Sequence, residues 1–255
     1  MRFETRRHRA RRELIEGGFG DDRRALCARR FRWWRGLTDA ERDRLEAVAL
    51  TLEADVTWEP ARGFEVTDEM KVTISAQAAL LVLALPDGMF RDVHTVIVHP
   101  TTLVLEGEHS QVEGIVSDDP MPVLGEAHDH GPVLLAWDEV LADARHAGDG
   151  RNVVLHEFAH KLDMLDGTVD GTPPLGSPDR YERWIEVCTE VYTEVVEGHG
   201  PAVLDPYAGV NPGEFFAVAT EAFFDAPGAL LHQRADLYGV LVDFYGQDPA
   251  RRGAA

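Results

Sequence analysis

The chain has 255 residues, of which 44% are hydrophobic, and its formal net charge is −20. This length and composition predict a globular protein with a substantial core, in one large domain or one domain with a small appendage. They argue against a membrane-spanning protein, because the longest apolar run, residues 76–85, has about half of the roughly 20 residues that a transmembrane helix needs.

The N-terminal segment has a charge opposite to that of the rest of the chain. Residues 1–35 contain twelve of the 25 basic residues and five acidic ones, a local balance of +7, so the remaining 220 residues carry −27. Such an acidic body repels nucleic acid and membrane surfaces, and we expect neither as a partner. We expect residues 1–30 to be a basic, flexible arm and residues 31–250 to form a single domain. Because the arm lacks the apolar segment of a secretory signal, a cytoplasmic location is expected.

The first half of the domain is predicted to combine helices with a small sheet. Residues 37–55 have apolar side chains at helical spacing behind a capping residue, Thr38, and predict an amphipathic helix. Residues 72–85 predict a buried helix, although their β-branched start leaves a strand open. Three short β-branched segments bounded by Pro, Gly and Asp predict strands. These are residues 93–98, 114–117 and 132–137.

From Trp137 onward the chain is predicted to be mainly helical. The expected helices are residues 137–148, 152–165, 179–198, 211–227 and 227–249, with a loop rich in Gly and Pro over residues 167–178. Asp179 and Asn211 are the expected N-caps of the third and fourth of these helices. The fold class that follows is α+β, with a small β-sheet and a mainly helical C-terminal half.

A histidine pair with the spacing of a metal site lies in the predicted helix of residues 152–165. His156 and His160 are four residues apart, so on a helix they lie about 40° apart around the axis and about 6 Å along it, and both rings can face one cation. Two imidazoles and a carboxylate suit zinc and leave a fourth position for water. Glu157 is rotated by about 100° from His156, which predicts a base and not a ligand. The alternative, two histidines without a metal, is disfavoured by the apolar residues around them.

The third protein ligand has two candidates in the sequence. Asp166 completes the pattern H-E-x-x-H-x-x-D-x-x-D, which is similar to that of the metzincins. In that motif a glycine turns the backbone toward the metal, and here Asp163 stands in its place. Glu214 opens another predicted helix, as in gluzincin-type sites, where a separate helix supplies a glutamate. We therefore favour Glu214 over Asp166, with one Zn²⁺ bound per chain.

Three further residues are candidates for supporting roles. Asp163 follows His156 by seven residues and returns to nearly the same helix face, where it can orient a ligand or form a surface salt bridge. Glu221 has the same relation to Glu214 and can orient a ligand histidine or be an exposed helix residue. Tyr207 precedes the helix of Glu214 and can donate a hydrogen bond to an oxyanion, although packing alone also explains a loop tyrosine.

Several segments of the chain closely resemble the MtfA (Mlc titration factor A) family of peptidases. They are RGFEVTDEMKVTISAQAALLVL, VIVHP, GPVLLAWDEV, HEFAHKLDMLDG, LDPYAGVNPGEFFAVATEAFFDAP and FYGQDP. The resemblance runs from about Phe31 to Pro249, and the Arg-rich first thirty residues lie outside the family pattern. The same core is similar to the catalytic domain of anthrax lethal factor, which has an HEFGH helix and an EFFAEAF helix.

The resemblance implies a zincin-like (gluzincin) fold and a set of site residues. It implies that His156, His160 and Glu214 bind zinc and that Glu157 is the catalytic base. Tyr207 stands seven residues before Glu214, as the catalytic tyrosine of lethal factor does before its glutamate ligand. The family resemblance also implies aminopeptidase activity, linked to glucose uptake through binding of the sugar-transport repressor Mlc.

The expected function is zinc-dependent hydrolysis of a peptide substrate. Glu157 takes a proton from the metal-activated water and Tyr207 stabilises the oxyanion. An alternative is a regulatory protein that binds and sequesters a transcriptional repressor similar to Mlc, with peptidase activity secondary. A third interpretation, nucleic-acid binding through the basic arm, is disfavoured by the −27 charge of the body.

Overall fold

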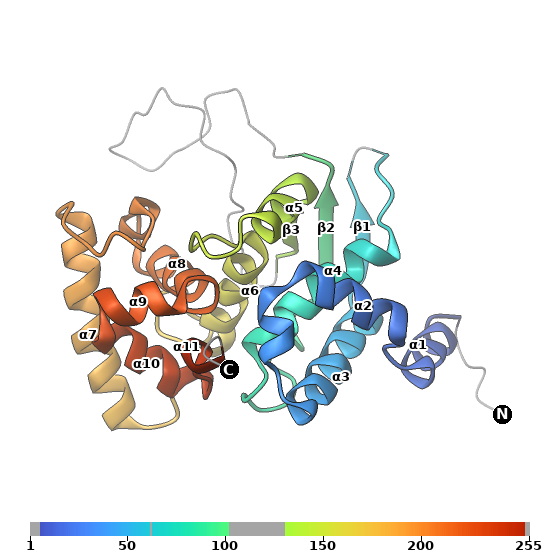
Figure 1. The fold of residues 1–255 in the computed structure, drawn as a ribbon, viewed down its shortest axis with the longest axis horizontal. Coiled ribbons are helices and arrows are strands. Elements are labelled where there is room, and N and C mark those ends of the chain that lie inside the picture. Colours follow the sequence, from blue (N-terminus) through green and yellow to red (C-terminus); the bar gives the residue numbers. More distant parts are fainter. Residues whose placement is uncertain (1–5, 62, 102–130, 253–255) are drawn as a thin grey trace.

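The computed structural model describes residues 6–61, 63–101 and 131–252. Helices predominate in these ranges and surround a small sheet (Figure 1). The α-helices are α1 (Arg6–Gly17), α2 (Asp21–Arg30), α3 (Asp39–Asp55), α4 (Asp68–Leu81), α5 (Trp137–Arg145), α6 (Val153–Asp163), α7 (Pro178–Val196), α8 (Pro212–Asp225), α9 (Pro227–Gln233), α10 (Ala235–Tyr245) and α11 (Pro249–Arg252). Three 3₁₀ turns join them: η1 (Arg32–Gly36), η2 (Met164–Asp166) and η3 (Pro206–Gly209).

The sheet has three parallel strands in the order β1 (Thr57–Pro60), β2 (Thr95–His99), β3 (Val133–Ala136). The strands predicted over residues 93–98 and 132–137 are thereby confirmed as β2 and β3. The strand predicted over residues 114–117 lies outside the described residues. β1 was not predicted, because its sequence, TWEP, has a proline and a glutamate and is largely exposed.

The two helices predicted before the sheet are confirmed as α3 and α4. The Thr38 side chain accepts a hydrogen bond from Glu41 N, while the Glu41 carboxylate accepts one from Thr38 N, a capping box that fixes the start of α3. Residues 72–81 of α4 are all buried, which explains why the segment shows no polar face. The strand alternative for this segment is wrong, and the helix ends at Leu81.

In the C-terminal half, two details of the helix predictions are wrong. Ser177, not Asp179, caps α7, since its side chain accepts a hydrogen bond from Arg180 N and Asp179 already lies in the first turn. The helix predicted over residues 227–249 is divided at Arg234, whose backbone is not helical (φ −144°, ψ 77°). The Arg234 guanidinium binds Glu190 and Glu194 of α7, so a contact between distant parts of the chain sets the break.

Residues 6–30, the described part of the segment expected to be a flexible arm, are mainly helical. They form α1 and α2, and Cys27 of α2 is fully buried in the core. Two arginines of α2 bind buried carboxylates of α3, each with two of its guanidinium nitrogens: Arg23 binds Glu53 and Arg24 binds Glu46. The basic segment therefore packs on the acidic body, because the charges of α2 and α3 are complementary.

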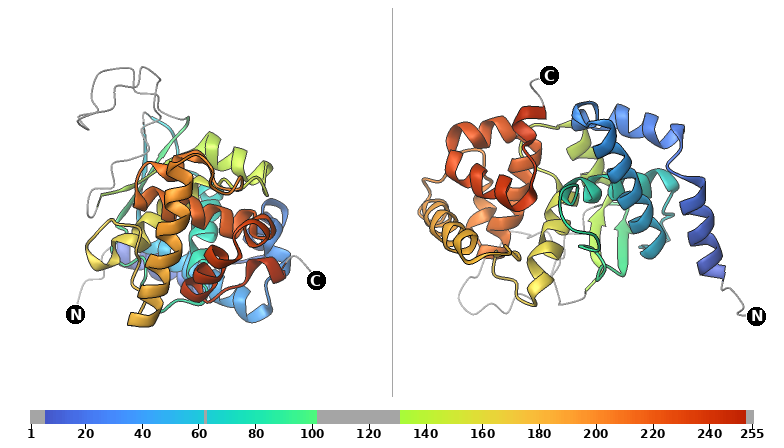
Figure 2. Two further views of the ribbon diagram at one scale, coloured as in Figure 1. Left: turned by 90° about the vertical axis from the view of Figure 1, so that its left-hand side faces the viewer. Right: turned by 90° about the horizontal axis from the view of Figure 1, so that it is seen from below.

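Helix α6 lies between two parts of the molecule (Figures 1 and 2). On one side are the sheet and the N-terminal helices, and α6 packs there against α4 and β3. On the other side are the C-terminal helices, and α6 packs most extensively against α8. Residues on α6 therefore meet residues from both parts. Within the described ranges no helix is both long and apolar enough to span a bilayer.

Candidate metal centre

The local sequence explains where α6 begins and which side chains it buries. Asn152 is the N-cap, and its Oδ1 accepts a hydrogen bond of 3.0 Å from Leu155 N. Apolar residues cover most of the helix surface and are buried: Val154, Leu155, Phe158, Ala159 and Leu162. The same helix also buries polar side chains, among them His156 and His160 at 5% and 7% exposure. Buried imidazoles need polar partners, and α8 supplies them.

Helix α8 brings a carboxylate to these histidines through its first turn. Asn211 caps it, with its Oδ1 accepting a hydrogen bond of 2.9 Å from Glu214 N, which confirms the predicted cap. Pro212 occupies the first helical position, where its missing N–H costs nothing. Residues 215–224 of α8 are buried and mostly apolar, so the position of α8 relative to α6 is fixed by packing.

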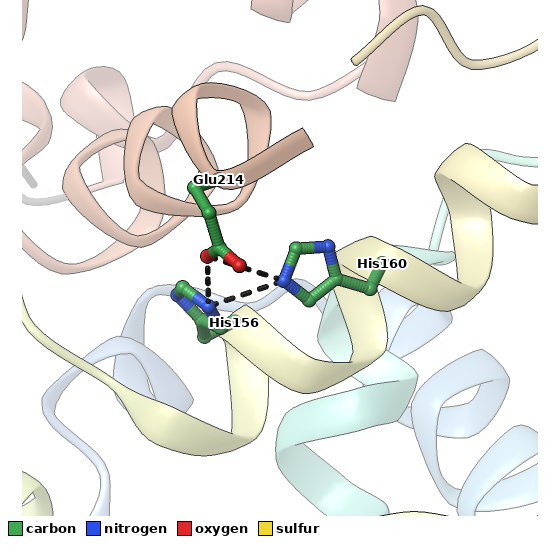
Figure 3. A group of neighbouring side chains, drawn as sticks. All are labelled: His156, His160 and Glu214. Carbon is green, nitrogen blue, oxygen red and sulfur yellow. Dashed lines mark hydrogen bonds and ion pairs between the residues drawn. The ribbon is translucent and has the colours of Figure 1, made fainter. Parts of the chain in front are cut away.

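His156, His160 and Glu214 form a compact cluster (Figure 3). Nε2 of His156 lies 3.2 Å from Nε2 of His160, and Oε2 of Glu214 lies 3.0 and 3.4 Å from these two nitrogens. Three ligands that each lie about 2.0–2.1 Å from a tetrahedral zinc ion are about 3.3 Å from one another. The cluster has these separations, so the three atoms fit one small cation.

The hydrogen bonding around the cluster supports the same fit. Oε2 of Glu214 is buried and makes no hydrogen bond of acceptable geometry despite its short contacts with the rings. On the other side of His156, Nδ1 lies 2.7 Å from Oε1 of Glu221. An ionised carboxylate only accepts, so Nδ1 carries the proton and the lone pair of Nε2 faces the cluster. A metal ion would satisfy the three converging acceptor atoms.

The electrostatics of the cluster favour positive charge. Burial lowers the pKa of His156, but its contacts with the Glu214 and Glu221 carboxylates outweigh burial and raise the pKa to about 10. Nε2 of His156 therefore holds a positive charge next to Glu214, either as a proton or as a metal ion that replaces that proton. Burial raises the pKa of Glu214, but contacts with both histidine rings outweigh it and lower the pKa to about 2. Glu214 is therefore an anion at neutral pH, and the pocket that it shares with the histidines attracts a cation.

Glu157 and Tyr207 border the cluster. Glu157 is 9% exposed, and burial raises the pKa of its carboxyl group, against the attraction of His156 and His160. Tyr207 lies on η3, with its ring centroid 6.2 Å from that of His156. Burial and the neighbouring Glu214 carboxylate raise the pKa of Tyr207, which keeps its hydroxyl protonated. A buried carboxyl group and a protonated hydroxyl group thus lie near the same three atoms.

Asp166 and Asp163 do not join the cluster. Asp166 is exposed and its Oδ1 accepts hydrogen bonds from the backbone and side chain of Thr168. Asp163 is fully buried, which excludes a surface salt bridge, and its Oδ2 accepts a hydrogen bond of 3.0 Å from Gly171 N. Gly171 has φ +76°, and a Cβ there would lie 2.3 Å from the carbonyl oxygen of Pro212. Asp163 therefore holds the loop after α6 against the start of α8.

Two carboxylates of α8 hold the segment that leads into α6. Glu221 is buried, so it is not an exposed helix residue, and its Oε2 accepts a hydrogen bond of 2.5 Å from Asn152 N. One turn later, Asp225 accepts hydrogen bonds from Gly148 N and Gly150 N, at 2.7 and 2.9 Å. The start of α6 is therefore fixed by the helix that carries Glu214.

Two polar residues near the site were missed in the sequence, Asn152 and Gln77. The Nδ2 atom of Asn152 donates a hydrogen bond of 2.7 Å to Oε1 of Gln77 on α4. Each has a feature in the sequence that could have marked it as important. Asn152 directly precedes the helix of the H-E-x-x-H motif, and Gln77 is a polar residue inside an apolar run. Neither signal identifies the partner, because the contact joins segments 75 positions apart.

Comparisons with known proteins place the chain in a family. The family model described as glucose-regulated metallo-peptidase M90 matches residues 4–246. The uncharacterized protein slr2042 of Synechocystis sp. is 34% identical over 229 residues, which cover 88% of this chain and 83% of that protein. Mlc titration factor A of Pectobacterium atrosepticum is 34% identical over 221 residues (85% and 83%), and that of Escherichia fergusonii is 31% identical over 223 (85% and 83%).

These matches also correct one expectation. The family model begins at residue 4, so the Arg-rich segment before residue 30 lies inside the family pattern and not outside it. The matched range includes α1, α2 and every residue of the candidate site. The chain therefore belongs to the glucose-regulated metallo-peptidase M90 family, together with the Mlc titration factor A proteins, and is a metallopeptidase.

Proposed function

We propose that the chain is a zinc-dependent peptidase that binds one Zn²⁺ through His156, His160 and Glu214. The observation that carries the proposal is the convergence of three acceptor atoms at 3.0, 3.2 and 3.4 Å. Two imidazoles and one carboxylate are a common ligand set of catalytic zinc, and they leave a position open to water or substrate. Because the carboxylate comes from a separate helix, we assign the site to the gluzincin type.

Zinc supplies Lewis acidity, which polarises the scissile carbonyl group and makes water a nucleophile near neutral pH. Glu157 is the proton acceptor in the proposed mechanism. Its raised pKa suits a group that accepts a proton from water and later gives it to the leaving amine. Tyr207 is the oxyanion donor, since its hydroxyl stays protonated and its ring lies next to His156.

The resemblance to anthrax lethal factor supports the roles of Tyr207 and Glu214 within this proposal. The seven-residue interval between them corresponds to that between the catalytic tyrosine and glutamate ligand of lethal factor. In this chain, the interval places Tyr207 on η3 and Glu214 in the first turn of α8, two elements that pack together. The fold is on this basis zincin-like.

The second candidate function is binding of a transcriptional repressor. Relatives with about one third identity are named Mlc titration factor A, a name that links those proteins to Mlc. For this chain, a repressor similar to Mlc is a candidate partner, and regulation of sugar uptake is a candidate role. A Glu157→Gln variant that lacks peptidase activity but still binds a repressor and changes transcription would favour this role over peptide hydrolysis.

The test of the peptidase proposal is cleavage of a peptide library by the zinc-loaded, full-length protein. Each peptide is supplied with a free and with an acetylated N-terminus, which separates aminopeptidase from endopeptidase activity. We expect cleavage that a chelator abolishes and added zinc restores, and loss of cleavage on acetylation if the enzyme is an aminopeptidase. Cleavage that continues unchanged in the chelator, or in the His156→Ala variant, would contradict the proposed zinc site.

A further inference from the structure

A buried hydrogen-bond network leads from helix α4 to the ring of His156. Glu221 is its central member, with Oε1 at 2.7 Å from Nδ1 of His156 and Oε2 at 2.5 Å from Asn152 N. Asn152 is joined in turn to Gln77 of α4, whose Oε1 lies 2.7 Å from Nδ2 of Asn152. The network of Gln77, Asn152, Glu221 and His156 therefore spans α4, α6 and α8.

Each donor and acceptor in the network has only one consistent assignment. Nε2 of Gln77 donates to Thr73 O at 3.1 Å, so Oε1 of Gln77 is the atom that accepts from Asn152. Oδ1 of Asn152 accepts from Leu155 N, so Nδ2 is the donor to Gln77. Gln77 thus fixes the orientation of the Asn152 amide.

Burial makes the network energetically important. Gln77 is 1% exposed, Asn152 7%, Glu221 8% and His156 5%. A buried polar group that loses its hydrogen-bond partner keeps its full desolvation cost. It is then free to turn toward another partner, so the loss of one member of the network disturbs the hydrogen bonds of the next. In contrast, Nδ1 of His160 is buried without a hydrogen-bond partner among the described residues. Among the described residues, a hydrogen bond to Nδ1 therefore orients the ring of His156 but not that of His160.

We propose that Gln77 is a positioning residue of the metal site, which acts through Asn152 and Glu221 on the ring of His156. The inference rests on the proposed zinc function and adds a residue from the opposite part of the molecule. By anchoring the Asn152 side chain, Gln77 keeps Asn152 N–H directed at Glu221. Glu221 then holds the Nδ1–H of His156 and directs Nε2 toward the metal.

The chain offers a matched control for substitution of Gln77. Gln247 is also a buried glutamine. Its Nε2 donates to the carbonyl oxygens of the last two residues of α4, Leu80 at 2.9 Å and Leu81 at 3.2 Å. Among the described residues, Gln247 makes no hydrogen bond with a member of the network. Gln77→Met and Gln247→Met therefore remove similar interactions with the same helix, and only the first interrupts the path to His156.

The measurement is the zinc dissociation constant of the full-length protein by competition with a chelator, together with the melting temperature. Glu221→Ala should weaken zinc binding by about 10- to 100-fold, as loss of a ligand-orienting partner does. Gln77→Met should weaken it by about tenfold, at the lower end of that range. Gln247→Met should lower the melting temperature and leave zinc affinity unchanged. Equal zinc affinities of Gln77→Met and Gln247→Met would overturn the proposal.

A double variant separates positioning from general destabilisation. If Gln77 acts through Glu221, Gln77→Met should cause no further loss of zinc affinity in the Glu221→Ala background. An additive loss would overturn the proposal. A second readout is the Nδ1–H proton resonance of His156 in the zinc-loaded protein. It should be lost in Glu221→Ala, shifted in Gln77→Met and unchanged in Gln247→Met, and an unchanged resonance in Gln77→Met would count against the network.

Asn152→Ser provides a second route if Gln77→Met fails to fold. Serine retains the cap of α6 but cannot reach Gln77, so zinc affinity should again fall while the helix start is preserved. Unchanged affinity in this variant would contradict the role of Gln77. Failure of the wild-type protein to bind zinc would instead contradict the proposed function, which distinguishes the two failures.

Discussion

Glu214 and Glu221 lie seven residues apart on α8 and contact opposite nitrogens of one ring, that of His156. Seven residues are nearly two helical turns, so both carboxylates project from the same face of α8. One helix therefore supplies both the carboxylate that faces the metal position and the carboxylate that sets the tautomer of the histidine. Because the remainder of α8 is buried, its packing against α6 fixes both contacts together.

The first prediction distinguishes the two candidates for the third ligand. His156→Ala, His160→Ala and Glu214→Ala should each lose stoichiometric zinc, measured by atomic absorption after dialysis. Asp166→Ala is the control and should retain zinc, because Asp166 is exposed and bonded to Thr168. Zinc loss in Asp166→Ala together with retention in Glu214→Ala would favour the metzincin-like alternative.

The second prediction concerns Glu157 as the base. Glu157→Gln retains the size of the side chain and removes its basicity, so folding and zinc content should be preserved. Turnover should fall by about 10²- to 10⁴-fold, the usual contribution of general acid–base catalysis. The check is steady-state kinetics on one peptide substrate, after the zinc content of each sample has been measured. Wild-type turnover in this variant would show that Glu157 is not the base.

The third prediction concerns Tyr207 as an oxyanion donor. Tyr207→Phe removes a hydrogen bond that forms mainly in the transition state, so kcat should fall while KM stays nearly constant. The loss should be smaller than that of Glu157→Gln. Tyr192→Phe is a suitable control, since among the described residues the Tyr192 hydroxyl makes one long hydrogen bond, of 3.5 Å, to Gly209 O at the end of η3. Equal kcat values in the two tyrosine variants would remove Tyr207 from the mechanism.

The sequence predicts the parts of the site that depend on local pattern. The spacing of His156 and His160 on an amphipathic helix, and the cap at Asn211 that opens the helix of Glu214, are both readable because helical periodicity is a local property. The distance between the helix of the histidines and the helix of Glu214 depends on the whole fold, so local periodicity does not predict it. The resemblance to a known family, and not spacing, favours Tyr207 and strengthens the choice of Glu214.

The features that could not be predicted arise from contacts between distant segments. The break at Arg234 depends on Glu190 and Glu194 of α7, and nothing near Arg234 in the sequence signals it. The N-terminal helices are held in place by ion pairs with buried glutamates of α3. The net charge of the chain does not show which acidic residues form these pairs. Gln77 and Asn152 are each visible as polar residues, but only the fold makes them partners.

The last prediction concerns Asp143 of α5, whose Oδ2 accepts a hydrogen bond of 2.7 Å from Val153 N at the start of α6. Burial raises the pKa of Asp143 to about 6 against this hydrogen bond, and the nearby Glu221 carboxylate adds to the increase. In the unfolded chain the pKa of an aspartate is about 3.9. The folded state therefore binds the proton more tightly than the unfolded state, so the stabilisation from this group is complete below about pH 4 and is lost as the pH rises through about 6.

Asp143→Asn isolates this contribution, because the amide keeps an oxygen that can accept from Val153 N and does not titrate. Between about pH 4 and pH 7 the free energy of unfolding of the variant should rise relative to that of the wild type, by at most about 3 kcal/mol. The measurement is urea unfolding of both proteins at a series of pH values and at equal zinc content. Asp138→Asn, an exposed position on the same helix, controls for the change in net charge. A difference between Asp143→Asn and wild type that stays constant over this range would show that the raised pKa of Asp143 does not contribute to stability.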